Sequence, residues 1–179
     1  SYCIIDEMVD FAYMKSEEEV RYDKTDIRLK AIIDYDIDLF ANRARQRNIQ
    51  FVSSCPKDLT ILANRDLLNI ILSNLITNAL RYSQAGKTIT INAMEDNDRI
   101  HILVKDEGMG IKPEELPSIF EEFYRSQRAR EIEKDGTGLG LPIVKRAVEV
   151  LNGKITVYSE VDKGSSFHIY LPKKNSKKG

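Results

Sequence analysis

The stretch NRDLLNIILSNLITNALRYS, residues 64–83, decides the fold of this chain. Its apolar residues recur at steps of three and four, which is the period of a helix with one buried face. They are Leu67, Leu68, Ile71, Leu72, Leu75, Ile76, Ala79 and Leu80. The pattern predicts a helix of about five turns at the centre of the core, and Asn64 is a suitable N-cap for it.

Three polar side chains form a second, narrower ridge on the same helix. Asn74, Asn78 and Arg81 follow one another at spacings of four and three residues, so they line up along one side. Asparagine is a poor helix former, because its amide competes with the backbone for hydrogen bonds. An amide oxygen is a good neutral ligand for magnesium, and an arginine neutralises a phosphate. For this helix alone, two amides on a solvated edge remain the simpler explanation.

The composition describes an ordinary globular domain. With 42% hydrophobic and 31% charged residues, the 179-residue chain is long enough for one domain and an appendage. A net charge of −1 gives no reason to expect nucleic acid as a partner, so any anion site must be local. Cys3 and Cys55 form no C-x-x-C pattern, which predicts neither a disulfide framework nor a zinc site and favours a cytoplasmic setting. We find no run near the ~18 apolar residues of a membrane span, and no signal peptide.

The remaining periodicities predict an α/β (α+β) two-layer sandwich. In it a mixed β-sheet is covered on one face by helices around residues 28–47, 65–82 and 141–151. Strands are expected at residues 49–53, 59–63, 88–94, 99–106, 154–160 and 166–172. Further helices are expected over residues 1–18 and 113–124.

Several local features complete this prediction. A short extended piece is expected at residues 20–22, and Thr25 or Asp26 is expected to cap the next helix. In the helix over 113–124, Leu116, Ile119, Phe120 and Phe123 are expected to point inward. The polar segment 125–135 is the best candidate for a mobile loop.

The first glycine cluster is DEGMGI, residues 106–111, at the end of a predicted strand. Glycine there lets the backbone pass close to a ligand. A carboxylate repels phosphate, so Asp106 is better suited to accept a hydrogen bond from an exocyclic amine such as that of adenine. A solvated aspartate in a strand-end turn explains the pattern equally well.

The second cluster is GTGLGL, residues 136–141, and it opens a predicted helix. Free N–H groups and a partial positive charge at a helix N-terminus attract a polyphosphate, which glycines allow to approach closely. Leu141 stands where the dinucleotide fingerprint G-x-G-x-x-G needs its last glycine, so a phosphate-binding helix start of another class is indicated. A glycine-rich hinge is the alternative.

Taken in order, these motifs resemble the catalytic, ATP-binding domain of a sensor histidine kinase. Its superfamily also holds DNA gyrase, the MutL proteins and the ninety-kilodalton heat-shock chaperone. NLITNALRYS resembles the N box, DEGMGI the G1 box, IFEEFYRS the F box, GTGLGLPIVKRAVEVLNGKI the G2 box and GSSFHIYLP the closing hairpin. The resemblance covers about residues 25–172, and it departs from the family where Asn64 replaces a usual aspartate and Asp135 a usual glycine.

The resemblance implies bound ATP with Mg2+ and assigns the residues that hold them. Asn78, helped by Asn74, would hold magnesium against the phosphates, and Asn78 and Arg81 would be the catalytic pair. Tyr82 would pack beside adenine, and Asp106 would bind the adenine amine. The other nucleotide-binding positions are Gly108, Gly110, Ile111, Arg125, Gly136, Thr137, Gly138, Leu139, Gly140, Leu141 and Ser166, the last through water.

The family pattern also implies a lid between the two glycine clusters. One of its arginines, Arg125, Arg128 or Arg130, would reach the terminal phosphate. Phe120 and Phe123 resemble supports of the lid rather than ligands.

Position 74 separates the reaction types of this superfamily. Hydrolytic members place a glutamate there as the base that activates water, whereas an amide cannot accept that proton. The family's phosphoryl acceptor is a histidine followed by an acidic residue, and His101 and His168 lie instead in predicted strands. The resemblance thus implies a transferase fragment that passes the γ-phosphate of ATP to a histidine outside this chain. A nucleotide-binding module without kinase activity, or an ATPase, is the alternative.

The same resemblance divides the chain and implies its partners. Residues 1–18 would end a dimerisation helix, 19–27 link it, 28–172 form the catalytic domain, and 173–179 form a frayed tail. The partners would be the parent's own dimerisation domain and a response regulator of a two-component system. The parent would be a homodimeric, cytoplasmic phosphoprotein; whether it is anchored to the inner membrane, and whether the fragment alone is a monomer, stay open.

Overall fold

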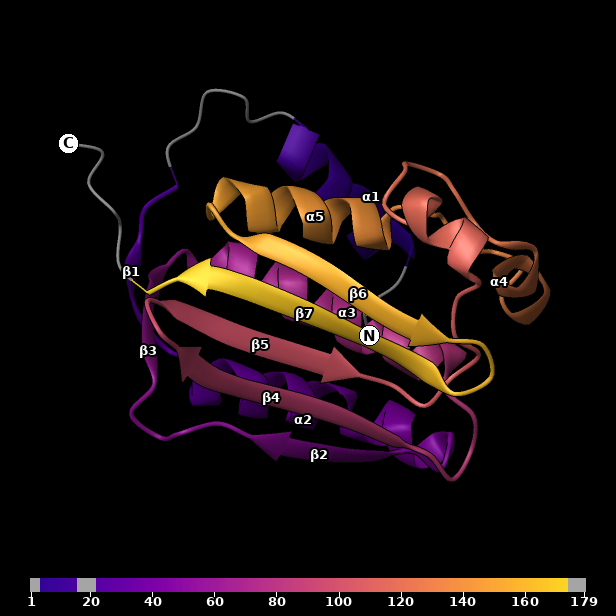
Figure 1. The fold of residues 1–179 in the computed structure, drawn as a ribbon, viewed down its shortest axis with the longest axis horizontal. Coiled ribbons are helices and arrows are strands. Elements are labelled where there is room, and N and C mark those ends of the chain that lie inside the picture. The colour runs from indigo at the N-terminus through magenta and orange to yellow at the C-terminus, as the bar shows by residue number, and fades with distance from the viewer. Residues whose placement is uncertain (1–3, 16–21, 174–179) are drawn as a thin grey trace.

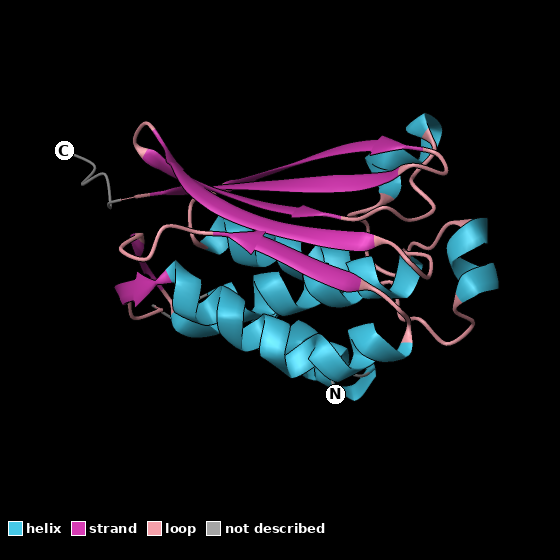
Figure 2. Cartoon of the chain, turned by 90° about the horizontal axis from the view of Figure 1, so that it is seen from below, coloured by secondary structure: helices cyan, strands magenta, loops and turns pink. Residues whose placement is uncertain are grey.

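A five-stranded β-sheet with a layer of helices on one face makes up the body of the molecule (Figures 1 and 2). The computed structural model describes residues 4–15 and 22–173. The helices are α1 (Ile4–Lys15), α2 (Leu29–Gln46), α3 (Arg65–Tyr82), α4 (Gln127–Ile132) and α5 (Gly140–Val150), with a 3-10 helix η1 (Pro113–Ser118). The strands are β1 (Thr25–Arg28), β2 (Gln50–Ser54), β3 (Thr60–Ala63), β4 (Thr88–Asp96), β5 (Arg99–Lys105), β6 (Lys154–Glu160) and β7 (Gly164–Pro172).

The sheet is mixed, as its sequence pattern predicts. Its strand order is β2-β4-β5-β7-β6, in which β2 runs parallel to β4 and the other neighbours are antiparallel. Alternation along β4 and β5 turns Ile91 and Val104 inward, opposite one another, and the face they share with Phe167 is covered by α2, α3 and α5. Among the residues that the structure describes, no helix lies on the other face of the sheet (Figure 1).

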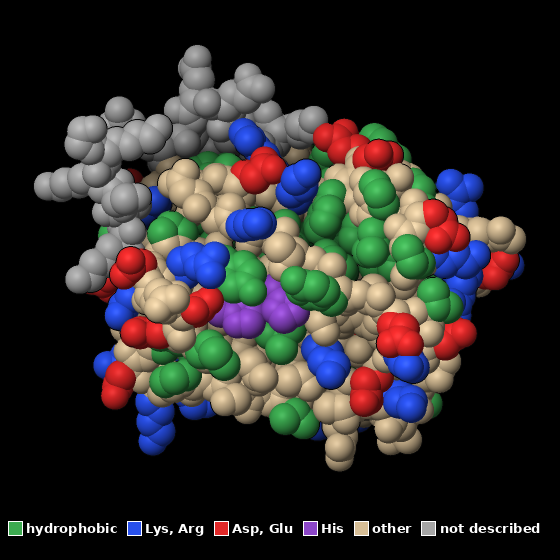
Figure 3. Space-filling view, viewed as in Figure 1, with side chains coloured by type: hydrophobic (Ala, Val, Ile, Leu, Met, Phe, Trp, Pro, Cys, Tyr) green, Lys and Arg blue, Asp and Glu red, His purple; other side chains and the backbone are tan. Residues whose placement is uncertain are grey.

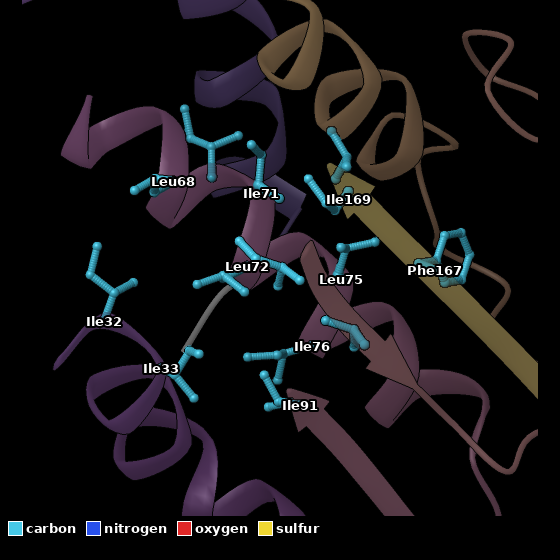
Figure 4. Packing of buried hydrophobic residues seen from close by; sticks show 14 of the residues in the cluster. Ile32, Ile33, Leu68, Ile71, Leu72, Leu75, Ile76, Ile91, Phe167 and Ile169 are labelled. Atoms are coloured by element: carbon cyan, nitrogen blue, oxygen red, sulfur yellow. The ribbon is translucent and has the colours of Figure 1, made fainter. Parts of the chain in front are cut away.

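Helix α3 lies at the centre of this arrangement. The Asn64 side-chain oxygen accepts a hydrogen bond from the Leu67 N–H at 3.0 Å, which confirms the predicted N-cap. Leu75 and Ile76 are almost fully buried and pack toward the sheet (Figure 4). Burying each such side chain contributes roughly 1.5–3 kcal/mol. This packing fixes the rotation of α3, and with it the direction of its polar ridge.

The chain enters α2 through a strand rather than a capped loop. Residues 25–28 form β1, which pairs with β3 in a separate two-stranded sheet, with Ile27 opposite Ile61 and 1% exposed. The prediction of Thr25 or Asp26 as an N-cap is therefore wrong, because pairing buries Ile27 and α2 starts directly after Arg28. Of the extended piece expected at 20–22, residues 20 and 21 lie outside the described residues.

The predicted helix over 113–124 is only a 3-10 helix, η1, followed by turns. Pro117 interrupts the helical hydrogen bonding, and Phe123 has a positive φ of 65°. Ile119 is buried as expected, but Phe123 is 63% exposed and does not point into the core. The segment 125–135, expected to be a loop, contains helix α4.

Two predictions concern the ends of the chain, the first helix and the frayed tail. Helix α1 occupies most of the range expected for the first helix, whose residues 1–3 and 16–18 lie outside the described residues. Lys173 is paired rather than frayed, since its N–H donates to Asp98 O at 3.0 Å; residues 174–179 lie outside the described residues.

Cys55 carries a free thiol. Within the described ranges, no helix is both long and apolar enough to span a membrane.

Candidate functional site

A pocket opens where the end of α3, the end of β5, the segment around α4 and the start of α5 meet. Its empty volume, open mouth included, is about 890 Å³. Most of the residues singled out in the sequence line it: Asn74, Asn78, Arg81, Tyr82, Asp106, Gly110, Ile111, Arg125, Gly136, Thr137, Gly138, Gly140 and Leu141. The N box and both glycine clusters, which are far apart in sequence, thus meet in one cavity.

Three of the expected residues do not line this pocket. Gly108 packs behind its wall, where a Cβ would lie 2.4 Å from the Tyr82 carbonyl oxygen. Leu139 is buried in the core. Ser166 does not line the pocket either, whereas its neighbour Ser165 does, because β-strand side chains alternate between faces.

One end of the pocket is built around Asp106, which is 5% exposed. Its Oδ1 accepts hydrogen bonds from the backbone N–H groups of Gly108 at 2.9 Å and Ser165 at 3.2 Å. Burial raises the pKa of Asp106 to about 6, although these two bonds act in the opposite direction. A Cβ on Gly164 would lie 2.1 Å from the Asp106 carbonyl oxygen, so the backbone is packed tightly around this carboxylate. We call this region the Asp106 end.

The amide ridge of α3 lines the pocket as well. Asn74 is 3% exposed, and its Nδ2 donates to the Ile70 carbonyl oxygen at 2.7 Å. This bond fixes the amide so that Oδ1 points toward the start of α5, 3.5 Å from where a Cβ on Gly140 would stand. Asn78 lines the pocket one turn further along. Neutral oxygen ligands of this kind suit a hard cation, and among the described residues no group of three His, Cys, Asp or Glu offers another metal site.

Another part of the pocket is built around Arg81, which is paired with carboxylates. Arg81 Nη2 lies 3.2 Å from Glu7 Oε1 of helix α1, and Arg81 Nε lies 2.7 Å from Glu133 Oε2. Burial acts to lower the pKa of Arg81, but attraction by Glu7, Tyr82 and Glu133 outweighs it and raises the pKa. The Thr137 hydroxyl also donates to Glu7. We call this region the Arg81 end.

Sequence reasoning missed Glu7, because nothing in the local spacing of α1 links it to a residue 74 positions away. A second α1 carboxylate lies near the amide ridge. Burial raises the pKa of Asp10 to about 6, and a hydrogen bond with Asn74 partly offsets this. The sequence of α1 carries three acidic residues, Asp6, Glu7 and Asp10, and nothing in their spacing marks the two that lie near α3.

Two arginines of the lid, Arg125 and Arg128, donate to other groups of the protein in this structure. Arg125 lines the pocket, but its guanidinium donates to the Ala129 and Lys134 carbonyl oxygens at 3.1 and 3.3 Å. Arg128 joins the lid to the Asp106 end, because it donates to Met109 O at 3.1 Å and lies 2.6 Å from Asp162 Oδ1. These arginines therefore hold the lid in place.

Both histidines lie together on the helix-free face of the sheet, outside the pocket (Figure 3). His101 Nε2 and His168 Nδ1 are 2.8 Å apart, and burial lowers the pKa of both rings. This agrees with their interpretation as strand residues.

The sequence matches the family model described as histidine kinase-, DNA gyrase B-, and HSP90-like ATPase over residues 63–175, more than half of the chain. The chain belongs to this family. The match contains the amide ridge and both glycine clusters, whereas Glu7, which also lines the pocket, lies outside it.

The relatives agree with this assignment. A sensor-like histidine kinase, SenX3 of Mycobacterium tuberculosis, is 32% identical over 94% of this chain. This chain spans only 41% of the length of SenX3. Among solved structures, full-length ShkA in complex with AMPPNP is similar with a TM-score of 0.80 and 26% identity, over 94% of this chain and 35% of ShkA. The catalytic domain of histidine kinase ThkA gives a TM-score of 0.74 and 27% identity, over 84% of this chain and 95% of that domain.

Proposed function

We propose that the pocket binds ATP with Mg2+ and presents the γ-phosphate to a histidine on another domain. The observation that carries this proposal is that a buried carboxylate, an amide ridge and a glycine-rich helix start line one cavity. These are an acceptor for the adenine amine, neutral ligands for a cation and donors for phosphates.

Adenine would bind at the Asp106 end. Both backbone N–H groups bind Oδ1 of Asp106, so Oδ2 is the oxygen that an exocyclic amine would meet. Tyr82 and Ile111 line the same cavity and offer apolar surface to the base. Ser165, which lines the pocket, would contact the nucleotide through water, the role that the resemblance gave to Ser166.

The phosphates and the cation would bind toward α5. Asn78 and Asn74 would hold Mg2+, which would neutralise charge on the phosphates. Glycines 136, 138 and 140 would admit the phosphates to the free N–H groups at the start of α5. With an amide at position 74, the pocket would hold ATP until an acceptor arrives and act by positioning and charge neutralisation.

The acceptor would come from the parent protein. In this proposal residues 1–18 end its dimerisation helix, 19–27 form a linker and 28–172 form the catalytic domain. The phosphorylated histidine would then pass its phosphoryl group to a response regulator, as in a cytoplasmic two-component system. This division is supported by the resemblance of residues 1–18 to the end of the family's dimerisation helix.

The test is phosphoryl transfer between separate polypeptides. The 179-residue chain is mixed with a dimerisation domain from a relative such as SenX3, together with γ-labelled ATP and Mg2+. We expect label on the acceptor histidine, and none when Asn78→Ala replaces the wild-type chain. Tight ATP binding without any transfer to several such domains would favour the module without kinase activity.

One observation favours an ATPase as the second candidate. Glu7 places a carboxylate at the Arg81 end, where a base for hydrolysis could act although position 74 is an amide. Phosphate released by the chain alone, and abolished in Glu7→Gln, would support the ATPase and contradict the kinase proposal.

A further inference from the structure

Helix α1 places its own carboxylate in an anion-binding position of the pocket. Glu7 is 3% exposed, its Oε1 lies 3.2 Å from Arg81 Nη2, and its Oε2 accepts a hydrogen bond from the Thr137 hydroxyl. Oε1 is also 3.8 Å from where a Cβ would stand on Gly140, the first residue of α5. A guanidinium, a hydroxyl and a helix N-terminus are the groups that bind a phosphate. Here they surround a glutamate.

Further contacts hold α1 in this position. Asp10, one turn after Glu7, faces the amide of Asn74. The Phe11 ring packs edge-on against Phe123, with ring centroids 6.2 Å apart. Helix α1 thus covers both the amide ridge and Arg81, and it contacts the segment that leads into the lid.

We propose that Glu7 and the triphosphate of ATP compete for this anion site, so that α1 must withdraw before the phosphates can bind. The inference rests on the proposed function and adds a regulation of the same pocket. Arg81 already pairs with Glu7 and Glu133, and a triphosphate placed beside these carboxylates would meet repulsion that only their departure removes. Linkage then requires the reverse effect, in which bound ATP displaces α1.

The test compares two ligands that differ in their phosphates. Glu7→Gln removes the charge at nearly constant size, and we expect the Kd for ATP to fall roughly tenfold, because less of the chain is held in the blocked state. The Kd for adenosine should not change, since adenosine reaches only the Asp106 end. The control is Glu149→Gln, which removes an exposed carboxylate of α5 outside the pocket and should alter neither Kd.

A second variant acts on α1 from outside the pocket. Phe11→Ala removes the contact with Phe123 and should also tighten ATP binding, and its effect combined with Glu7→Gln should be less than additive, because both release one helix. Hydrogen exchange provides an independent measurement. The amides of α1 should exchange faster with ATP bound than with adenosine bound.

Unchanged or weaker ATP binding in Glu7→Gln, with adenosine binding intact, would overturn the competition. A helix α1 that stays equally protected under saturating ATP would do the same. Failure of the wild-type chain to bind either ATP or adenosine would instead refute the proposed function, so the two ideas fail in different ways.

Discussion

The two ends of the pocket hold their polar groups in different ways. At the Asp106 end, backbone N–H groups fix the carboxylate and glycines leave no room around it. At the Arg81 end, side chains from α1, α3 and the lid meet as ion pairs. Backbone bonds form once the strands pair, whereas side-chain pairs rearrange when a helix or a lid moves. We infer that the Asp106 end is preformed for adenine, and that the Arg81 end must rearrange before the phosphates bind.

The largest expected effect comes from breaking the preformed end. Gly110 has a φ of 68°, and a Cβ there would lie 2.1 Å from the Glu160 carbonyl oxygen. Gly86 has a similar φ of 81° but nothing within 4 Å of that position. We expect Gly110→Ala to lower the free energy of unfolding by more than ~3 kcal/mol and Gly86→Ala by about 1 kcal/mol, which is strain alone.

Urea unfolding followed by circular dichroism measures both variants. Equal losses in the two would mean that the backbone near Gly110 adapts to a side chain, and that the Asp106 end is not rigid.

The next largest effect is expected on the affinity for adenosine when the Asp106 carboxylate is replaced by an amide. Asp106→Asn keeps an oxygen for the Gly108 and Ser165 N–H groups, but it turns an NH2 donor toward the adenine amine. A lost hydrogen bond and an unpaired donor cost about 2–3 kcal/mol, so the affinity for adenosine should fall by roughly 30- to 150-fold. Calorimetric titration measures it, and unchanged affinity would remove Asp106 from the site.

A smaller effect follows from pH. With a folded-state pKa of about 6, Asp106 is ionised at pH 7 and largely protonated at pH 5. Because Oδ1 accepts two N–H bonds, the added proton goes to Oδ2 and faces the ligand amine as a donor. Adenosine affinity should therefore be nearly constant above pH 7, be about halved at pH 6, and fall about tenfold in all between pH 7 and pH 5.

The control for this pH effect is a second carboxylate with a raised pKa, on helix α1. Asp10 also has a pKa of about 6 but faces Asn74. Asp10→Asn should leave the pH profile of adenosine binding unchanged. A profile that flattens in this variant would show that the two sides of the pocket are coupled.

The same contrast explains what the sequence could reveal. Asp106, Gly108 and Gly110 form one contiguous motif at a strand end, and the resemblance of this motif to the G1 box was what favoured a binding role over a solvated turn. Ser165 lines the pocket and Ser166 does not, because a shift of one residue changes the face of a strand. The helices that cover the sheet were predictable for a similar reason, since each carries its own apolar period.

The Arg81 end depends on contacts that no local pattern records. Glu7 pairs with a residue 74 positions later, and an acidic residue on an amphipathic helix normally faces solvent. Phe123 was assigned to the core by its apolar spacing, yet it lies exposed beside Phe11. Spacing rules describe one element at a time, and this end is made by three.

The smallest effect concerns the contacts that join the lid to the Asp106 end. Arg128 of the lid contacts Asp162 and the Met109 carbonyl oxygen beside the Asp106 end. These groups are partly exposed, so Arg128→Ala should weaken adenosine binding by no more than about fivefold. Lys163→Ala is the matched control, because it breaks an exposed pair with Glu160 on the same turn without touching the lid. An effect of a hundredfold or more for Arg128→Ala alone would mean that the lid builds the Asp106 end, and the division of the pocket into a fixed and a movable part would no longer hold.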